Sequence, residues 1–429
     1  MSALTPDRGF LPQDSTAPQS TQAELLPNQH LIQSFVSARD ESVAICKPLA
    51  IEDFVVQPRA EVSPPKWHLA HTTWFFEQAV LSRFEDNYQY FNDAWLKLFN
   101  SYYKSAGLHW LQSERGQLSR PTVDEVLEYR RVVDARVISL LERLGNDQEI
   151  RRIIAIGIHH EQQHQELLYM DIKSILGSNP LLPVYVADDW DPVPAMDSNW
   201  DKFDAALVEI GHFGYEFAYD NEGPRHKQYL NAFALRNNSV SNAEFLDFMA
   251  DGAYEQASIW LSQGWDWVQQ NRVQAPLYWF RTDSGWQQFT LHGVKPVNPN
   301  EPVTHVSYFE ADAFARWAGY RLPVEAESET WLLGQNAAPE QDSRRHPTRV
   351  DRASLQVWHW TSSHYSAYPG YRPYEGMLEE YNGKFMCNQF VLRGGCVATP
   401  SSHYRPSYRN FFLPEQRWMF SGIKLARDI

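Results

Sequence analysis

The segment from Asn146 to Gly177 constrains the fold of this chain more than any other. It reads NDQEIRRIIAIGIHHEQQHQELLYMDIKSILG, and its apolar residues recur at spacings of three and four, which predicts one long helix. One stripe of that helix consists of Ile153, Ile156, His160, His164 and Leu167. His160 and His164 therefore continue the face that the helix buries. Two imidazoles one turn apart on such a face are either metal ligands or core histidines with other partners.

Helical periodicity also covers three earlier segments, which are residues 20–49, 63–84 and 122–144. Ser63 is predicted to cap the second of them, and prolines follow in its first turn. Thr122 and Glu125 have the spacing of a capping box at the start of the third. Long helices with mostly short polar joins predict a four-helix bundle.

The helical periodicity of the sequence ends after the fourth helix. We assign residues 1–22 to a disordered leader, 23–178 to the helical bundle, 179–200 to a proline-containing linker and 201–429 to a second domain. In the second domain, short strand-like runs such as ALVEIG, YLNAFALR, QFTLHG and FVLRGG alternate with turn residues, and SYFEADAFARWAG predicts a helix. The expected fold class is therefore an α-helical bundle followed by an α+β domain.

Composition excludes several classes of function. The chain has 429 residues and a formal net charge of −15. Without a long cluster of lysine and arginine, a nucleic-acid partner is not expected. No segment approaches the roughly 18–20 uncharged apolar residues of a membrane span. Three scattered cysteines are too few for a disulfide framework, which favours a cytoplasmic protein.

A third histidine completes a candidate metal site. His71 shares a stripe with Trp74 and Phe75 on the second helix, so it also points into the bundle. Facing helices of a bundle are where such folds place metal ligands. Three neutral ligands, His71, His160 and His164, would leave positions open for substrate and water. Composition alone does not separate zinc from iron, because imidazole suits both.

Two polar residues next to this group have open roles. Gln163 adjoins the histidine pair and lies either at a pocket edge or on an exposed helix face. Glu166 follows His164 by two residues and does not share its face, so we expect it to be solvated.

Several motifs together resemble one known family. SPPKWHLAHTTWFFE and HHEQQHQELLYMDIK resemble the DinB-like helical domain of the iron-dependent sulfoxide synthases of ergothioneine biosynthesis. Downstream, VEIGHFGYEFAYDNEGPRH, YNGKFMCNQFVLRGGCVATP and YRNFFLPEQRWMFSGIKLARD are similar to the second domain of that family. This domain has the C-type-lectin-like fold of formylglycine-generating enzymes. The resemblance covers about residues 25–429.

The resemblance implies a reaction and a ligand set. It makes His71, His160 and His164 the ligands of Fe(II), with O2 as co-substrate. The family joins the sulfur of a cysteine donor to C2 of the imidazole of hercynine (N-alpha-trimethylhistidine), and the product sulfur becomes a sulfoxide. One branch of the family carries a catalytic, proton-donating tyrosine pair in the loop after the second helix. NSYYKSAG places Tyr102 and Tyr103 there, and Tyr102 is the favoured donor.

The resemblance also implies substrate-binding residues. Asn410 matches a substrate-binding position, and Gln163 matches a residue near the substrate imidazole. Phe411 and Phe412 occupy the place where synthases that use gamma-glutamylcysteine carry an acidic residue, so free cysteine is the expected thiol donor. The trimethylammonium of hercynine attracts aromatic faces, and the cage candidates are Phe411, Phe412, Tyr408 and Trp418.

Other functions remain open at this point. Gamma-glutamylcysteine is the alternative thiol donor. Cys396 lies alone after RGG, where sulfatase-maturing enzymes need a cysteine pair, and we expect Cys387 and Cys396 to be small buried residues. His359 replaces an acidic residue that is common in relatives, which leaves a structural cation there in question. The rival functions are a C5-specific histidine sulfoxide synthase of the ovothiol type, a non-catalytic metal-binding scaffold and a zinc hydrolase. The sequence leaves the oligomeric state open.

Overall fold

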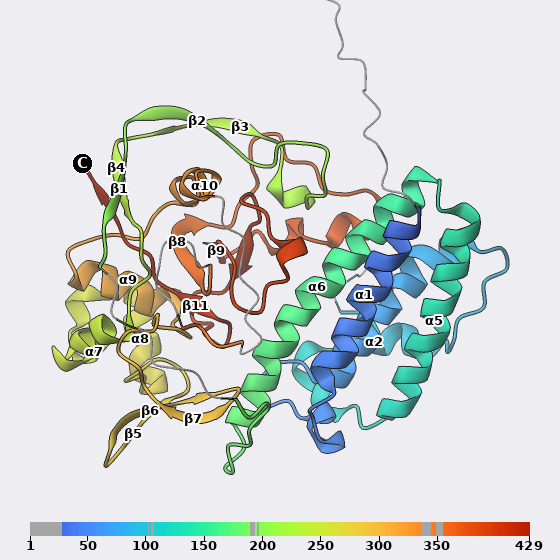
Figure 1. The fold of residues 1–429 in the computed structure, drawn as a ribbon, viewed down its shortest axis with the longest axis horizontal. Coiled ribbons are helices and arrows are strands. Elements are labelled where there is room, and N and C mark those ends of the chain that lie inside the picture. The colour runs from blue at the N-terminus through green and yellow to red at the C-terminus, as the bar shows by residue number, and fades with distance from the viewer. Residues whose placement is uncertain are drawn as a thin grey trace, which may run out of the picture.

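The fold combines a helical bundle with a domain of small sheets and helices (Figure 1). It comes from a computed structural model that describes residues 28–101, 103, 107–188, 194, 197–335, 345–348 and 355–429. The leader predicted for residues 1–22 lies outside this part of the chain. No helix among the described residues is long and apolar enough to cross a membrane.

Long helices form the bundle, as the sequence predicts. They are α1 (Asn28–Cys46), α2 (Pro65–Phe76), α5 (Val123–Leu144) and α6 (Gln148–Gly177). Short elements connect them: η1 (Ile51–Val55), the π-helical turn η2 (Glu77–Leu81), α3 (Ser82–Phe84), α4 (Trp95–Phe99) and η4 (Gln112–Gln117). Helix α2 packs against both α5 and α6, while α1 packs against α6. Every residue of α2 is buried, because neighbours cover all of its faces.

The caps of two bundle helices were predicted with different success. Thr122 caps α5, and the Glu125 carboxylate accepts a hydrogen bond from the Thr122 backbone N–H, which confirms the capping box. The prediction for Ser63 is wrong, since α2 begins at Pro65 with Pro64 before it. The Ser63 hydroxyl instead accepts a hydrogen bond from Arg115, and its backbone N–H donates to Asp171 on α6.

The C-terminal domain contains several small sheets. The strands of the domain are β1 (Trp200–Phe203), β2 (Ala206–Ile210), β3 (His226–Leu230), β4 (Phe233–Arg236), β5 (Trp279–Thr282), β6 (Gly285–Thr290), β7 (Gly293–Pro296), β8 (Trp358–His364), β9 (Phe390–Arg393), β10 (Asn410–Phe412), β11 (Ser421–Gly422) and β12 (Ala426–Asp428). One sheet has four strands in the order β10-β9-β8-β11, and another has three strands in the order β1-β4-β12. The run YLNAFALR proves to be parts of two strands, β3 and β4, with a break between them.

Helices and 3-10 turns surround these sheets. The helices are α7 (Asn242–Ala250), α8 (Ser262–Asn271), α9 (Tyr308–Trp317) and α10 (Glu325–Leu333), and the turns include η5 (Asp220–Glu222), η8 (Gly376–Glu380), η9 (Gly383–Phe385) and η10 (Ser401–His403). Helix α9 confirms the prediction for SYFEADAFARWAG, with Ser307 as its N-cap. The observed architecture therefore confirms the expected fold class.

Helix α6 lies on the side of the bundle that faces the C-terminal domain (Figure 1). One side of it faces α1 and α2, and the other side reaches the C-terminal domain through buried polar contacts. The Glu166 carboxylate, for example, accepts hydrogen bonds from Trp358 Nε1 at 2.6 Å and from Thr399 Oγ1 at 2.6 Å. Glu166 is therefore positioned both by α6, which belongs to the bundle, and by side chains of the C-terminal domain.

Candidate metal centre

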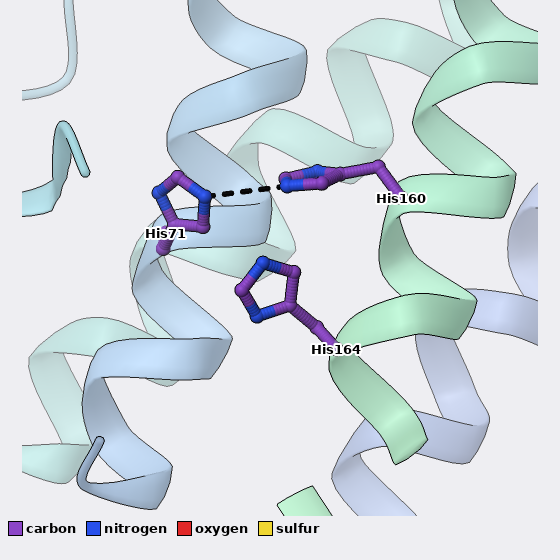
Figure 2. A group of neighbouring side chains, drawn as sticks. All are labelled: His71, His160 and His164. Atoms are coloured by element: carbon purple, nitrogen blue, oxygen red, sulfur yellow. Dashed lines mark hydrogen bonds between the residues drawn. The ribbon is translucent and has the colours of Figure 1, made fainter. Parts of the chain in front are cut away.

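Three histidine side chains converge between α2 and α6 (Figure 2). His71 comes from α2, and His160 and His164 come from successive turns of α6. One potential ligand nitrogen from each ring can be chosen so that all three lie within 4.8 Å of one another. The Nε2 atoms of His71 and His160 are 3.3 Å apart, close to the separation of two nitrogens that each lie about 2.1 Å from a shared ion.

Burial keeps these imidazoles neutral. Removal from water lowers the pKa of His160 to about 3, and it lowers the pKa of His71 and His164 well below the usual value. Nearby imidazoles contribute in the same direction, because each opposes a second positive charge. A neutral ring has a lone pair for a metal ion, whereas an imidazolium has none. The group is therefore ready to bind a cation near neutral pH.

The partner of the second ring nitrogen differs among the three histidines. His71 Nδ1 lies 2.6 Å from the Phe99 carbonyl oxygen, which only accepts hydrogen bonds, so Nδ1 carries the proton and Nε2 is left bare. His164 Nδ1 lies 2.8 Å from His68 Nδ1. His160 Nδ1 is buried and has no hydrogen-bond partner among the described residues.

Aromatic side chains pack around the three histidines and shield them from water. Trp67 stacks on the His71 ring at 4.5 Å between centroids, and Phe75 lies 4.6 Å from the His160 ring. The Arg115 guanidinium lies over Trp67 at 3.3 Å from the ring centroid. Excluding water from such a site strengthens every electrostatic interaction inside it.

A buried ion network fixes α6 directly beside His160. The Glu161 carboxylate accepts hydrogen bonds from Arg39 and Arg130, both at 2.7 Å, and from the Ser42 hydroxyl at 2.5 Å. These groups tie α6 to α1 and α5 in the bundle core. The two guanidinium groups hold the pKa of Glu161 at about 2, against the opposing effect of burial. The network fixes the register of α6 and with it the direction of His160.

The C-terminal domain reaches the histidines through Gln163. Its amide Nε2 donates to the Tyr408 hydroxyl at 2.8 Å, and its Oε1 accepts from the Tyr381 hydroxyl at 2.6 Å. The Tyr381 ring is 5.8 Å from the His160 ring. Gln163 is half-buried and so is not an exposed helix glutamine, and its place at a pocket edge stays a prediction. Tyr381 was missed, because it is one of 21 tyrosines and follows the turn η8 without any periodic pattern.

Comparison with known proteins gives the family. The DinB superfamily model matches residues 34–168, and the sulfatase-modifying factor enzyme 1-like domain model matches residues 194–347. A hercynine oxygenase of Mycobacterium tuberculosis is 32% identical over 310 residues, which cover 65% of this chain and 72% of that protein. This chain belongs to the hercynine oxygenase family.

Two further proteins are also similar to this family member. Ergothioneine biosynthesis protein 1 of Schizosaccharomyces pombe is 24% identical over 369 residues, which cover 75% of the chain and 45% of that protein. A formylglycine-generating enzyme of Streptomyces coelicolor is 33% identical over 277 residues, covering 50% of the chain and 84% of that enzyme.

Of the tyrosine pair predicted for this hercynine oxygenase family member, one residue is placed. Tyr103 is fully buried, and its ring stacks on Trp74 at 5.7 Å, which in turn stacks on His71 at 5.8 Å. Asn100 holds the Tyr103 backbone through hydrogen bonds to both its N–H and its carbonyl group. Tyr102 lies outside the described residues.

Asn410, Phe411 and Phe412 form strand β10, so alternate side chains face opposite sides. Phe411 stacks on Tyr365 at 4.0 Å, inside the C-terminal domain. Phe412 lies 5.3 Å from Trp418, whose indole N–H donates to Asp171 on α6. The strand therefore directs Phe412 and Asn410 to the α6 side and Phe411 to the other side.

The predictions for Glu166 and for the two cysteines have clear outcomes in this family member. The prediction that Glu166 is solvated is wrong, since it is buried against the C-terminal domain, and burial raises its pKa to about 7. Cys396 is buried as predicted, whereas Cys387 is exposed, because it lies in an open loop after η9. His359 is buried and lies 2.8 Å from the Ser239 hydroxyl.

Proposed function

We propose that this protein is an Fe(II)- and O2-dependent oxidoreductase of ergothioneine biosynthesis. It joins the sulfur of cysteine to C2 of the hercynine imidazole and oxidises that sulfur to a sulfoxide. The observation that carries the proposal is the buried group of His71, His160 and His164 in a chain of the hercynine oxygenase family. The names of its relatives indicate hercynine as the substrate, and the three neutral imidazoles offer a site for a metal ion.

The donor set fits a redox-active divalent ion. His71 presents a bare Nε2 toward the site because its Nδ1 is engaged with Phe99. Three neutral imidazoles leave the positive charge of such an ion uncompensated and leave coordination positions open, which favours an incoming thiolate. When bound, Fe(II) would supply the site where thiolate, substrate imidazole and O2 meet.

The protein's own residues would orient the substrate. Gln163 is held between Tyr408 and Tyr381, so its amide has a fixed direction beside the histidines. We assign Gln163 to the substrate imidazole and Asn410 to the polar end of hercynine. Phe412 and Trp418 offer aromatic surface on the α6 side for the trimethylammonium, an attraction of roughly 0.5–2 kcal/mol per ring. Phe411 would support the strand from its opposite face.

A phenol would supply the proton that the oxidation of sulfur requires. Tyr102 and Tyr103 remain candidates from the loop after α4, and Tyr381 is a third because its ring is 5.8 Å from His160. A phenol is protonated at neutral pH and donates without being charged at rest. Replacing each tyrosine in turn by phenylalanine identifies the donor. The variant that lacks the donor should still bind the metal but should form a different product.

Free cysteine is the proposed thiol donor. By the family resemblance, Phe411 and Phe412 occupy the sequence positions where synthases that use gamma-glutamylcysteine carry an acidic residue. Neither side chain can pair with an ammonium group. Gamma-glutamylcysteine would therefore bring a charged group against aromatic surface that cannot compensate it.

Oxygen uptake tests the proposal directly. Metal-free protein, Zn(II)-loaded protein and Fe(II)-loaded protein are mixed with hercynine and cysteine, together and separately, in an oxygen electrode. We expect uptake only from the Fe(II) form and only with both substrates. Iron binding without uptake, with either thiol, would support a non-catalytic scaffold instead. Turnover by the zinc form without O2 would support a hydrolase.

A further inference from the structure

We propose that His68 and Asp171 are positioning residues that direct the Nε2 atom of His164 toward the metal, and that Trp418 extends this chain into the C-terminal domain. The inference rests on the metal centre proposed above. It adds His68 and Asp171, which touch neither metal nor substrate, as partners of one metal ligand. The chain runs from the bundle to the other domain in the order His164, His68, Asp171 and Trp418.

Four hydrogen bonds define the chain. His164 Nδ1 and His68 Nδ1 are 2.8 Å apart, and His68 Nε2 is 2.9 Å from Asp171 Oδ2. Trp418 Nε1 donates to Asp171 Oδ1 at 2.9 Å, and the Ser63 backbone N–H donates to Asp171 Oδ2 at 2.8 Å. His68 and Asp171 are each 2% exposed, so water does not compete for these contacts.

The direction of each hydrogen bond follows from what the partners can do. A carboxylate accepts hydrogen bonds and does not donate them, so the proton between Asp171 and His68 belongs to His68 Nε2. A neutral His68 then has a bare Nδ1, which must accept from the ring opposite it. The proton between the two rings therefore belongs to His164 Nδ1. His164 is left with its lone pair on Nε2, the nitrogen that remains for a metal ion.

The three histidines of the metal centre are thus secured in different ways. His71 is set by the Phe99 carbonyl oxygen within the bundle. His160 has no partner for Nδ1 among the residues that the structure describes. His164 alone of the three is set by a side-chain relay, and its last member, Trp418, belongs to the C-terminal domain. Correct packing of that domain on α6 therefore helps to orient one ligand of a site that lies in the bundle.

Outer partners of this kind typically change metal affinity by 10- to 100-fold when they are removed. His68→Phe removes both ring nitrogens and should weaken Co(II) binding by about that factor. His68→Gln keeps an acceptor oxygen and a donor N–H on one side chain, so it should retain affinity to within about threefold. Asp171→Asn should keep its amide oxygen toward His68 Nε2 and the Ser63 N–H, because both groups donate to the same oxygen, and it should lose the hydrogen bond from the Trp418 indole.

Competitive titration of Co(II) into metal-free protein measures these affinities, and the Co(II) absorption bands report the number of ligands. Trp418→Phe is compared with Trp360→Phe, a matched control whose indole donates to the Val306 carbonyl oxygen and not to a member of the relay. We expect the first to lower Co(II) affinity and the second to leave it unchanged. Thermal unfolding of each variant verifies that the fold is retained.

Nitrogen-15 spectra of the metal-free protein give a second readout that loss of stability alone would not move. The His164 signals are identified by their absence from the spectrum of His164→Gln. They should show a proton on Nδ1 in the wild type, and this preference should be lost in His68→Phe, which removes the acceptor. Equal Co(II) affinity of wild type and His68→Phe, or equal losses in His68→Gln and His68→Phe, would overturn the inference. If the wild type binds neither Co(II) nor Fe(II), the metal centre itself fails, and the spectra still decide the tautomer.

Discussion

In the bundle, the three histidines of the metal centre lie on two regular helices, α2 and α6, whose every turn is packed. In the C-terminal domain, the side chains that reach them, Tyr381 and Trp418, lie outside helices and strands. The bundle therefore offers rigid, repeating positions suited to holding an ion. The irregular domain offers phenol, indole and amide groups whose directions depend on loops. We infer that the bundle binds the metal and that the C-terminal domain determines what happens beside it.

The strongest test of this division is removal of a ligand. His160→Ala should lower Fe(II) affinity at least about 100-fold, beyond the 10- to 100-fold cost of losing an outer partner. His30→Ala, at an exposed position of α1, is the matched control and should bind Fe(II) normally. Iron content after gel filtration measures both. Full iron content in His160→Ala would remove His160 from the ligand set.

The next test concerns the rigidity of the bundle. Glu161→Gln leaves the guanidinium groups of Arg39 and Arg130 without their shared carboxylate, and breaking a buried ion pair costs about 3–5 kcal/mol of unfolding free energy. The exposed pair of Arg131 and Glu128 provides a control, since Glu128→Gln should leave stability unchanged. Urea unfolding followed by circular dichroism compares the two. Equal stability of both variants would show that the network does not hold α6.

A test on the other side of the comparison is Tyr381→Phe. If the C-terminal domain directs the chemistry, this variant should bind Fe(II) like the wild type but lose roughly 100-fold or more in sulfoxide formation, the usual scale for a general acid. Tyr374→Phe is the control, because its hydroxyl donates to the Ala218 carbonyl oxygen. Normal product formation by Tyr381→Phe would move the proton donor to Tyr102 or Tyr103.

A further test concerns the junction between the two parts. Lys173 of α6 lies 2.8 Å from His305 Nε2, with the rings of Tyr278 and Phe420 nearby, and the charge of Glu301 acts to raise its pKa. Burial lowers the pKa of Lys173 to about 7. An unfolded lysine titrates near 10.4, so between about pH 7 and pH 10 the unfolded state binds the extra proton. Stability should therefore rise with pH across this window.

Lys173→Met should remove that rise. Urea unfolding of the wild type and the variant at pH 7 and pH 9.5 gives the two slopes. An identical slope in the variant would show that the Lys173 amine stays charged in the folded protein.

The same contrast explains what the sequence could predict. Helical periodicity places His160 and His164 on one face, and His71 follows from its spacing to Trp74 and Phe75, so the triad is readable from sequence. His68 carries a similar signal, because it lies three residues before His71 on α2. Its role, however, depends on Asp171, which lies on α6 two turns after His164. Tyr381 and Trp418 have no period to mark them, because irregular segments obey no fixed repeat.

Burial was harder to predict than position. Glu166 looks solvated on its own helix, since its side chain leaves the apolar stripe. Its burial comes from Trp358 and Thr399, which are distant in sequence and cover that face of α6. Contacts between the two parts of the molecule therefore decide which polar residues of α6 are exposed, and no pattern within α6 records them.

The most direct measurement is the mass of the product formed in air by the Fe(II)-loaded protein from hercynine, with equal amounts of cysteine and gamma-glutamylcysteine present. The account predicts hercynylcysteine sulfoxide as the main product. A product containing the glutamyl group would keep the reaction and contradict the role assigned to Phe412. No sulfoxide from either thiol, with iron bound to the histidines, would contradict the central claim that this metal centre forms carbon–sulfur bonds.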